Sequence, residues 1–157
     1  MKIEVKEYTY ETMPDYICNL DNIPEIKMTG EEIGVDYFPD VVYDRKDGVD
    51  LHLQLLVPSI FNHPNKKFPG VVFIQGSAWK KQNIYRNVAN IGALAKRGYV
   101  CAIVEYRHSG IAHFPAQIID GKNAIRYLKA HHDQYHLDSD NIIVMGDSSG
   151  GHTSAMI

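Results

Sequence analysis

The residues best placed to do chemistry lie near the end of the sequence, where segment 146–150 reads G-x-S-x-G directly after the apolar run 142–145. A strand that turns sharply into a helix holds its serine in a strained backbone conformation, so the residues two positions away must be small. Gly146 and Gly150 meet that need. The first helical turn also offers free N–H groups that favour negative charge beside the serine. We therefore expect Ser148 to be the nucleophile of a nucleophile elbow; the alternative is a glycine-rich turn whose serines cap a helix.

A serine that attacks an acyl group needs preorganised donors for the oxyanion that forms. In the α/β-hydrolase arrangement one donor is the backbone N–H of the residue after the nucleophile, which here is Ser149. The other donor comes from the loop that follows an earlier buried strand. In this chain that loop is Gln-Gly-Ser-Ala-Trp at 75–79, directly after the apolar run 71–74. Together the two segments predict the nucleophile and the oxyanion hole of an acyl-transfer site.

Several further motifs occur in a fixed order around these two segments. They form the ordered set of the QGSAW loop, Glu105-Tyr106-Arg107, Phe114-Pro115-Ala116-Gln117, Asp120 and the GDSSGGH segment. With this set the chain resembles, over roughly residues 35–157, bacterial α/β-hydrolase carboxylesterases of the hormone-sensitive-lipase and feruloyl-esterase-like type. The resemblance implies that the backbone N–H groups of Ser77 and Ala78 are the loop donors of the oxyanion hole. It also implies a serine esterase without a metal or cofactor.

The loop departs from the family pattern in its side chains. The usual histidine at its start is Gln75 here, and two of the usual glycines are Ser77 and Ala78. Backbone donation does not depend on a side chain, so the departure affects the conformation of the loop more than its role. Trp79 has two interpretations, a wall of the substrate pocket or a ring that packs under the loop.

Other polar residues near these motifs have structural interpretations. The resemblance suggests that Arg107 and Asp120 pair behind the site, together with a structural Tyr106. His152 lies one helical turn after Ser148, but an elbow turns its serine away from its own helix, so we expect packing rather than base catalysis. Three further histidines lie near a predicted helix end, where the helix dipole accounts for them: His131, His132 and His136.

The remaining catalytic groups are expected elsewhere. In this fold the triad runs along the chain as serine, then Asp or Glu, then His. Residues 149–157 contain no acidic residue. We therefore expect the triad acid and the general base beyond Ile157, in a longer hydrolase of which this chain is the N-terminal portion. Without a base a serine hydroxyl is a weak nucleophile, so the chain alone is expected to be nearly inactive.

The first third of the sequence predicts an arm followed by a hairpin. Residues 1–32 are rich in Glu, Asp, Tyr and Pro, which suits an arm lying over a core. Alternating runs at 35–43 and 49–57 flank segment 44–48, whose Asp-Gly pair is a hairpin turn signal. We expect two antiparallel strands at the edge of a sheet.

The rest of the sequence alternates between buried strands and helices. We expect strands at 70–74, 99–104 and 141–145, a helix capped by Asn83 and ended before Gly98, and a second helix from Pro115 to about His131. This order is typical of right-handed βαβ units. The predicted fold class is α/β: a mainly parallel α/β-hydrolase-type sheet with an N-terminal antiparallel hairpin. We expect one partial domain, an arm at 1–32 followed by the N-terminal half of the hydrolase core at 33–157, truncated after the elbow.

Composition narrows the function classes. Sixteen basic and nineteen acidic residues give a net charge of −3, with no basic block, so we expect neither a nucleic-acid nor a membrane partner. We expect no disulfide between Cys18 and Cys101, and the absence of a CxxC pair argues against metal or redox motifs. The N-terminus lacks the apolar region of a signal peptide, and no run approaches membrane-spanning length, so we expect a cytoplasmic protein.

Three functional hypotheses follow. The first is a serine carboxylesterase acting on short acyl or aryl esters through Ser148. The second is an inactive fragment or binding module that self-associates through the apolar strand 142–145, which would form an exposed sheet edge. The third is an aminopeptidase-like hydrolase of the same fold, because ester and amide cleavage share this chemistry.

Overall fold

A computed structural model describes residues 6–15, 23–27, 29–30, 33–61 and 64–157. The chain divides into two units, residues 1–30 and 31–157. The described part of the first unit contains no helix or strand; it holds a turn in which the N–H groups of Thr12 and Met13 donate to the carbonyl of Thr9. The expected course of the arm over the core stays a prediction, and Cys18 lies outside the described residues.

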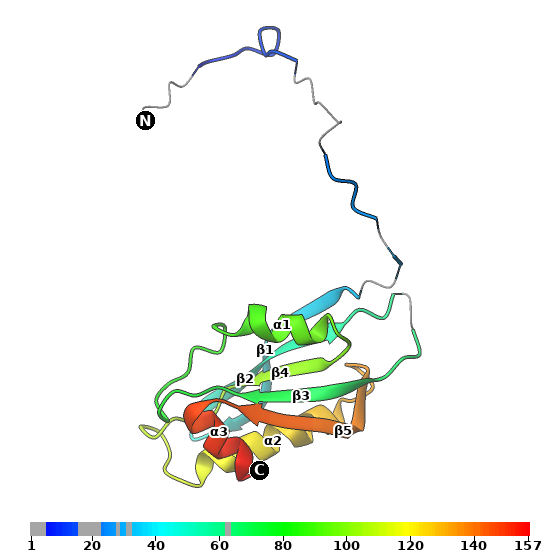
Figure 1. Cartoon of the computed structure of the whole chain (residues 1–157). Coiled ribbons are helices and arrows are strands. Elements are labelled where there is room, and N and C mark those ends of the chain that lie inside the picture. Colours follow the sequence, from blue (N-terminus) through cyan, green and yellow to red (C-terminus); the bar gives the residue numbers. More distant parts are fainter. Residues whose placement is uncertain (1–5, 16–22, 28, 31–32, 62–63) are drawn as a thin grey trace. The chain divides into compact units, whose positions relative to one another are not determined.

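The second unit is built on a five-stranded sheet in the order β1-β2-β4-β3-β5 (Figure 1). β3, β4 and β5 are parallel to one another, whereas β2 runs antiparallel to both β1 and β4. The sheet is therefore mixed, with the predicted hairpin at one edge and the predicted parallel strands beside it. The strands are β1 (Val35–Lys46), β2 (Val49–Pro58), β3 (Phe68–Ile74), β4 (Val100–Val104) and β5 (Leu137–Gly146).

The hairpin is longer than the sequence pattern predicted. β1 continues through residues 44–46, which were expected in the turn, and only Asp47 and Gly48 connect the strands. Their φ angles are 50° and 74°. A two-residue hairpin with positive φ at both positions matches the right-handed twist of the flanking strands, which is why an Asp-Gly pair suits this turn.

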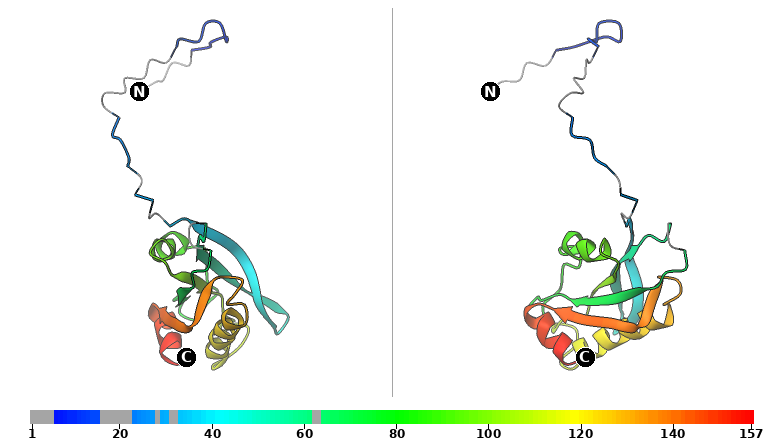
Figure 2. Two further views of the ribbon diagram at one scale, coloured as in Figure 1. Left: turned by 90° about the vertical axis from the view of Figure 1, so that its right-hand side faces the viewer. Right: turned by 45° about the vertical axis from the view of Figure 1, so that its right-hand side comes forward.

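Three helices cover the sheet on opposite faces: α1 (Val88–Ala95) on one, and α2 (Ala116–Ala130) and α3 (Ser148–Ala155) on the other (Figure 2). The predicted start of the first helix is wrong. Residues 84–87 form turns, and the Asn83 side chain accepts a hydrogen bond from Tyr85 N–H at 3.2 Å instead of capping a helix. Gly98, with φ of 88°, follows this helix, and α2 matches its predicted bounds closely.

The core has two layers, one on each side of the sheet. Alternate residues of β3 and β4 pack under α2 or under α1, and every residue of β4 is buried. β5 does not follow the prediction of a strand buried on both faces. Ile142 and Val144 pack towards α2, whereas Ile143 is 54% and Met145 39% exposed on the other face. The physical reason is that α1 covers β4 and β2 but does not extend over β5.

β3 lies between the next two strands of the chain, β4 and β5, and this arrangement positions the site. The crossover through α1 leads to β4 on one side of β3, and the crossover through α2 leads to β5 on the other. Loops that leave two such strands towards opposite faces open a crevice at their carboxyl ends, where ligands bind in open α/β sheets. Ile74 pairs with Gly146, so segment 75–79 and the elbow leave the sheet side by side at this point.

The helices of the described residues are too short and too polar for any of them to cross a membrane.

Candidate active site

The elbow has the strained geometry that the G-x-S-x-G pattern predicts. β5 ends at Gly146, Asp147 is extended with φ of −113° and ψ of 152°, and Ser148 begins α3 with φ of 48°. A non-glycine residue at positive φ is uncommon and carries strain that its surroundings must hold. Ser148 is exposed, as a residue that meets substrate must be.

Two glycines allow this turn to sit against the end of β3. A Cβ atom on Gly150 would lie 2.0 Å from the carbonyl oxygen of Ile74, and one on Gly146 would lie 2.5 Å from the same oxygen. Both contacts are with backbone, which cannot swing aside. The small residues are therefore required by the approach of the elbow to β3.

Gly76 is a third glycine with the same function, and the sequence reasoning did not single it out. A Cβ atom there would lie 2.6 Å from the Asp147 carbonyl oxygen and 2.8 Å from the Ser148 Cβ. The loop after β3 therefore runs directly against Ser148. Its position in the sequence, two residues after a buried strand, is the signal that pointed to the loop as a whole.

Side chains on both sides of Ser148 hold this loop. The Asp147 carboxylate accepts the Gly76 N–H at 2.8 Å. The Ser149 hydroxyl oxygen accepts the Ser77 N–H at 3.0 Å and, more weakly, the Trp79 N–H at 3.4 Å. Sequence reasoning used only the backbone N–H of Ser149 and missed the hydroxyl, because no spacing rule links residues about 70 positions apart.

The predicted loop donors are thus not equivalent. The Ser77 N–H is directed at the Ser149 hydroxyl, whereas the Ala78 N–H has no hydrogen-bond partner within the described part of the chain. Ala78 and Trp79 have positive φ angles of 51° and 56°. Non-glycine residues therefore adopt, in this loop, conformations that the usual glycines would adopt more easily.

A buried tyrosine, Tyr106, holds the QGSAW loop through its hydroxyl group. The Tyr106 hydroxyl donates to the Gln75 carbonyl at 3.0 Å and lies 3.0 Å from the Ser77 hydroxyl, and its ring is 2% exposed. Its own N–H donates to the Gln82 side chain. Gln75, in the position of the family's histidine, is also buried and accepts a hydrogen bond from Asn87. Tyr106 therefore has the structural part suggested for it.

The predicted pair of Arg107 and Asp120 is confirmed. The guanidinium donates to both carboxylate oxygens of Asp120, at 2.7 Å from Nη2 to Oδ1 and 2.9 Å from Nε to Oδ2, and Asp120 is fully buried. Asp47, at the tip of the hairpin, also pairs with the guanidinium. These carboxylates raise the pKa of Arg107, which therefore stays charged. The network joins the β1–β2 turn, the segment after β4, and α2.

No histidine among the described residues hydrogen-bonds to Ser148. His152 is exposed and lies edge-on to Trp79, with ring centroids 5.7 Å apart. His52 Nδ1 lies 2.7 Å from a carboxylate oxygen of Glu105, and His131 contacts the Tyr127 carbonyl. His63 lies outside the described residues.

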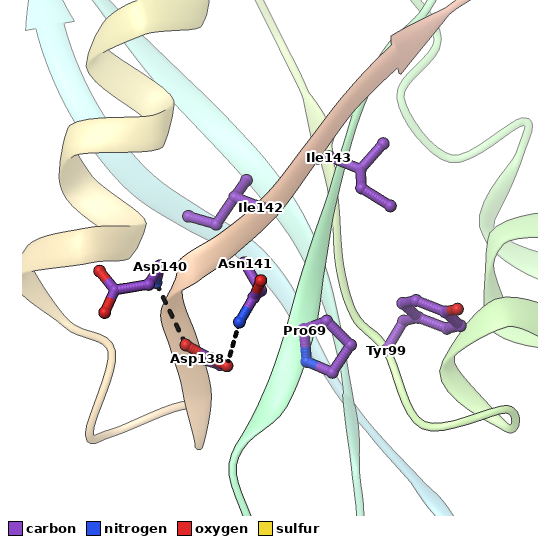
Figure 3. Close-up of a pocket in the computed structure, with 7 residues that line it drawn as sticks. All are labelled: Pro69, Tyr99, Asp138, Asp140, Asn141, Ile142 and Ile143. Carbon is purple, nitrogen blue, oxygen red and sulfur yellow. Dashed lines mark hydrogen bonds between the residues drawn. The ribbon is translucent and has the colours of Figure 1, made fainter.

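A polar cavity of about 320 Å³ adjoins the elbow on the α1 side. Its lining includes Gln75, Asn87, Asn90 and Asp147, so it lies beside the loop. A larger cavity of about 470 Å³ lies at the opposite end of β3 and β5, where Pro69 and Tyr99 face residues 138–143 (Figure 3). The part of the chain that the structure describes brings together no three side chains suited to hold a metal ion.

The fold and the elbow define part of an α/β-hydrolase, and comparison with known proteins agrees. The BD-FAE family matches residues 55–157, and the chain belongs to this family. A thermophilic esterase from Thermogutta terrifontis superposes with a TM-score of 0.68 and 27% identity, over 78% of this chain and 43% of that one.

Two curated relatives come from Mycobacterium tuberculosis. Esterase LipC is 35% identical over 94 residues, and the probable carboxylic ester hydrolase LipM is 39% identical over 90 residues. These alignments cover 59% and 56% of this chain. The chain spans less than a quarter of the length of either relative, 23% of LipC and 21% of LipM.

Proposed function

We propose that this chain supplies the nucleophile and the oxyanion hole of a serine carboxylesterase. The observation that carries the proposal is the geometry of Ser148, exposed at positive φ on a strand-turn-helix whose glycines pack against β3. The relatives named as esterases and the family membership support ester hydrolysis as the reaction.

In the proposed reaction the Ser148 hydroxyl attacks the carbonyl carbon of an ester. A bond forms from Ser148 Oγ to that carbon, the alcohol leaves, and water later releases the acid from the acyl-enzyme. The developing oxyanion is stabilised by N–H groups from the first turn of α3 and from the QGSAW loop. Ser149, Ser77 and Ala78 are the proposed sources of these N–H groups.

We propose that the general base and the triad acid come from outside residues 1–157. The support is that no described histidine hydrogen-bonds to Ser148, and that His152, the nearest in sequence, packs against Trp79. A serine without a base stays protonated and reacts slowly.

Short acyl or aryl esters are the proposed substrates. The Thermogutta terrifontis esterase has been solved with propionate and with butyrate bound, which supports short acyl groups. Trp79, the last residue of the loop, is 40% exposed, and we propose its ring as a wall of the substrate pocket.

Acetylation of the chain by p-nitrophenyl acetate tests this proposal. We expect slow release of p-nitrophenolate, with the acetyl group found by peptide mass spectrometry on Ser148 and lost in Ser148→Ala. Ser154→Ala is the matched control, since that hydroxyl bonds to the Gly150 carbonyl within α3. Equal release by Ser148→Ala would contradict the nucleophile. Turnover at an ordinary enzymatic rate of about 10 s⁻¹ would instead place the base within the chain.

A second candidate function is self-association through β5. The observation that favours it is the exposure of Ile143 and Met145 on one face of this edge strand. It predicts a concentration-dependent oligomer that Ile143→Lys disperses, measured by sedimentation velocity, and no acetylation of Ser148.

A further inference from the structure

The side chain of Ser149 has a function separate from that of its backbone. Its hydroxyl is buried between α3 and the QGSAW loop, in a residue that is 5% exposed. There it accepts the N–H of Ser77 at 3.0 Å and that of Trp79 at 3.4 Å. The backbone N–H of the same residue lies in the first turn of α3, where no preceding helical carbonyl can accept it.

Within residues 76–80, the hydrogen bonds of the loop use every backbone N–H group except one. Gly76 donates to Asp147, Ser77 and Trp79 donate to Ser149, and Lys80 donates to the Ser77 carbonyl. Among residues 76–80, all of them described, only the Ala78 N–H lacks a hydrogen-bond partner. It belongs to a segment that passes directly beside Ser148, as the close approach of Gly76 to the nucleophile shows.

We infer that Ser149 is a positioning residue whose hydroxyl ties the oxyanion loop to the elbow, and that this tie assigns the loop's oxyanion donor to Ala78 rather than Ser77. The assignment of Ala78 as the oxyanion donor, the donor part of this inference, rests on the proposed function. The hydrogen-bonded tie between the Ser149 hydroxyl and the loop does not. The consequence for the proposed reaction is a hole of two N–H groups, from Ala78 and Ser149, with Ser77 held in a structural hydrogen bond.

The tie fits the backbone strain of this loop. Ala78 and Trp79 are held at positive φ, where residues with a side chain are strained. Such conformations persist only when their surroundings over-determine them. Two N–H groups bound by one buried hydroxyl, with the Tyr106 hydroxyl below, provide that restraint.

Amide hydrogen exchange of the ¹⁵N-labelled chain, followed by NMR, tests the tie without any catalysis. In the unaltered chain the Ser77 amide should exchange about tenfold more slowly than the Ala78 amide, as expected for one hydrogen bond of ordinary strength. Ser149→Ala should remove this protection. Ser154→Ala makes the same chemical change on the same helix and should leave it in place.

Equal exchange of the Ser77 and Ala78 amides in the unaltered chain would overturn the tie, even if Ser149→Ala failed to fold. A folded Ser149→Ala chain that kept the protection of Ser77 would overturn it as well.

Diethyl 4-nitrophenyl phosphate tests the donor part. Ser148 Oγ bonds to phosphorus, the bond from phosphorus to the aryl oxygen breaks, and 4-nitrophenolate leaves while the serine proton passes to buffer. In the adduct we expect the Ala78 and Ser149 amide protons to move downfield and the Ser77 proton to stay. A downfield shift at Ser77 instead of Ala78 would overturn the assignment. Failure of Ser148 to form an adduct would reject the donor part together with the proposed function, while the exchange result would still decide the tie.

Discussion

The two ends of the β3–β5 pair carry polar residues of similar kinds and use them differently. At the carboxyl end, Asp147 and Ser149 bind the backbone of a loop about 70 residues earlier in the chain. At the amino end, Asp138 binds the N–H of Asp140 and the side chain of Asn141, both within the same irregular stretch of β5 (Figure 3). The amino end has the larger cavity, yet its polar groups satisfy one another locally.

This difference shows that cavity volume alone does not single out the proposed site. The cavity at the amino end, about 470 Å³, forms because residues 139–141 bulge out of the pairing between Pro69–Asp138 and Gly70–Ile142. The carboxyl end has the smaller polar cavity, but also a strained serine, tightly approached glycines and an N–H group that no described residue accepts. Convergence of distant segments on a strained residue is the more specific sign of a functional site.

The largest effect on stability should come from removing the Asp120 carboxylate, which lies at the carboxyl end of the parallel strands. Asp120→Ala leaves the buried guanidinium of Arg107 without its main partner, so the free energy of unfolding should fall by about 3–5 kcal/mol. Asp138→Ala removes a carboxylate at the amino edge and should leave stability nearly unchanged. Urea unfolding followed by circular dichroism measures both. Equal losses would remove the distinction between the two ends.

Replacing a glycine by alanine at each end of the β3–β5 pair should affect the stability of the two ends almost as differently. Gly150→Ala places a Cβ against the backbone of Ile74 and should cost about 3 kcal/mol, at the upper end for overpacking. Gly70→Ala, near the amino end of the same strand pair, meets the tip of the Leu137 side chain at 2.7 Å, which can rotate away. We expect its effect to stay within about 1 kcal/mol. Thermal unfolding of the two variants compares them, and a larger loss for Gly70→Ala would contradict this account.

The smallest effect concerns the pKa of Asp138. The side chain of Asn141, then the Asp140 N–H, lower this pKa below its ordinary value. Because the folded pKa lies below the unfolded one, the contribution to stability is present above the unfolded pKa and lost as pH falls through the folded pKa. Asn141→Ala should return the pKa towards its ordinary value in a ¹³C NMR titration of the carboxyl carbon. Ser139→Ala, in the same stretch of β5, should leave the pKa of Asp138 unchanged. An unchanged pKa in Asn141→Ala would show that the Asn141 side chain does not lower it.

Local sequence patterns predicted the parts of the fold that depend on local physics. The continuous apolar runs of β3 and β4 identified strands buried on both faces, and the Asp-Gly pair identified the hairpin turn. The elbow glycines follow from the same local argument, because their need comes from one sharp turn.

Sequence reasoning missed three features, and two of them depend on contacts between distant segments. The run at 142–145 gives no sign that a helix covers only one face of β5. The helical spacing continues through Ile84, although the Asn83 side chain holds a turn there. The Ser149 hydroxyl could not be assigned, because its partners lie about 70 residues away.

Labelling with a fluorophosphonate, mapped by peptide mass spectrometry, tests the central claim most directly. The account predicts that the adduct forms on Ser148 in preference to Ser77, Ser149 and Ser154, that added imidazole speeds its formation by acting as a base, and that Ser148→Ala abolishes it. An adduct spread evenly over the exposed serines, or labelling that persists in Ser148→Ala, would contradict the claim that this elbow carries the nucleophile.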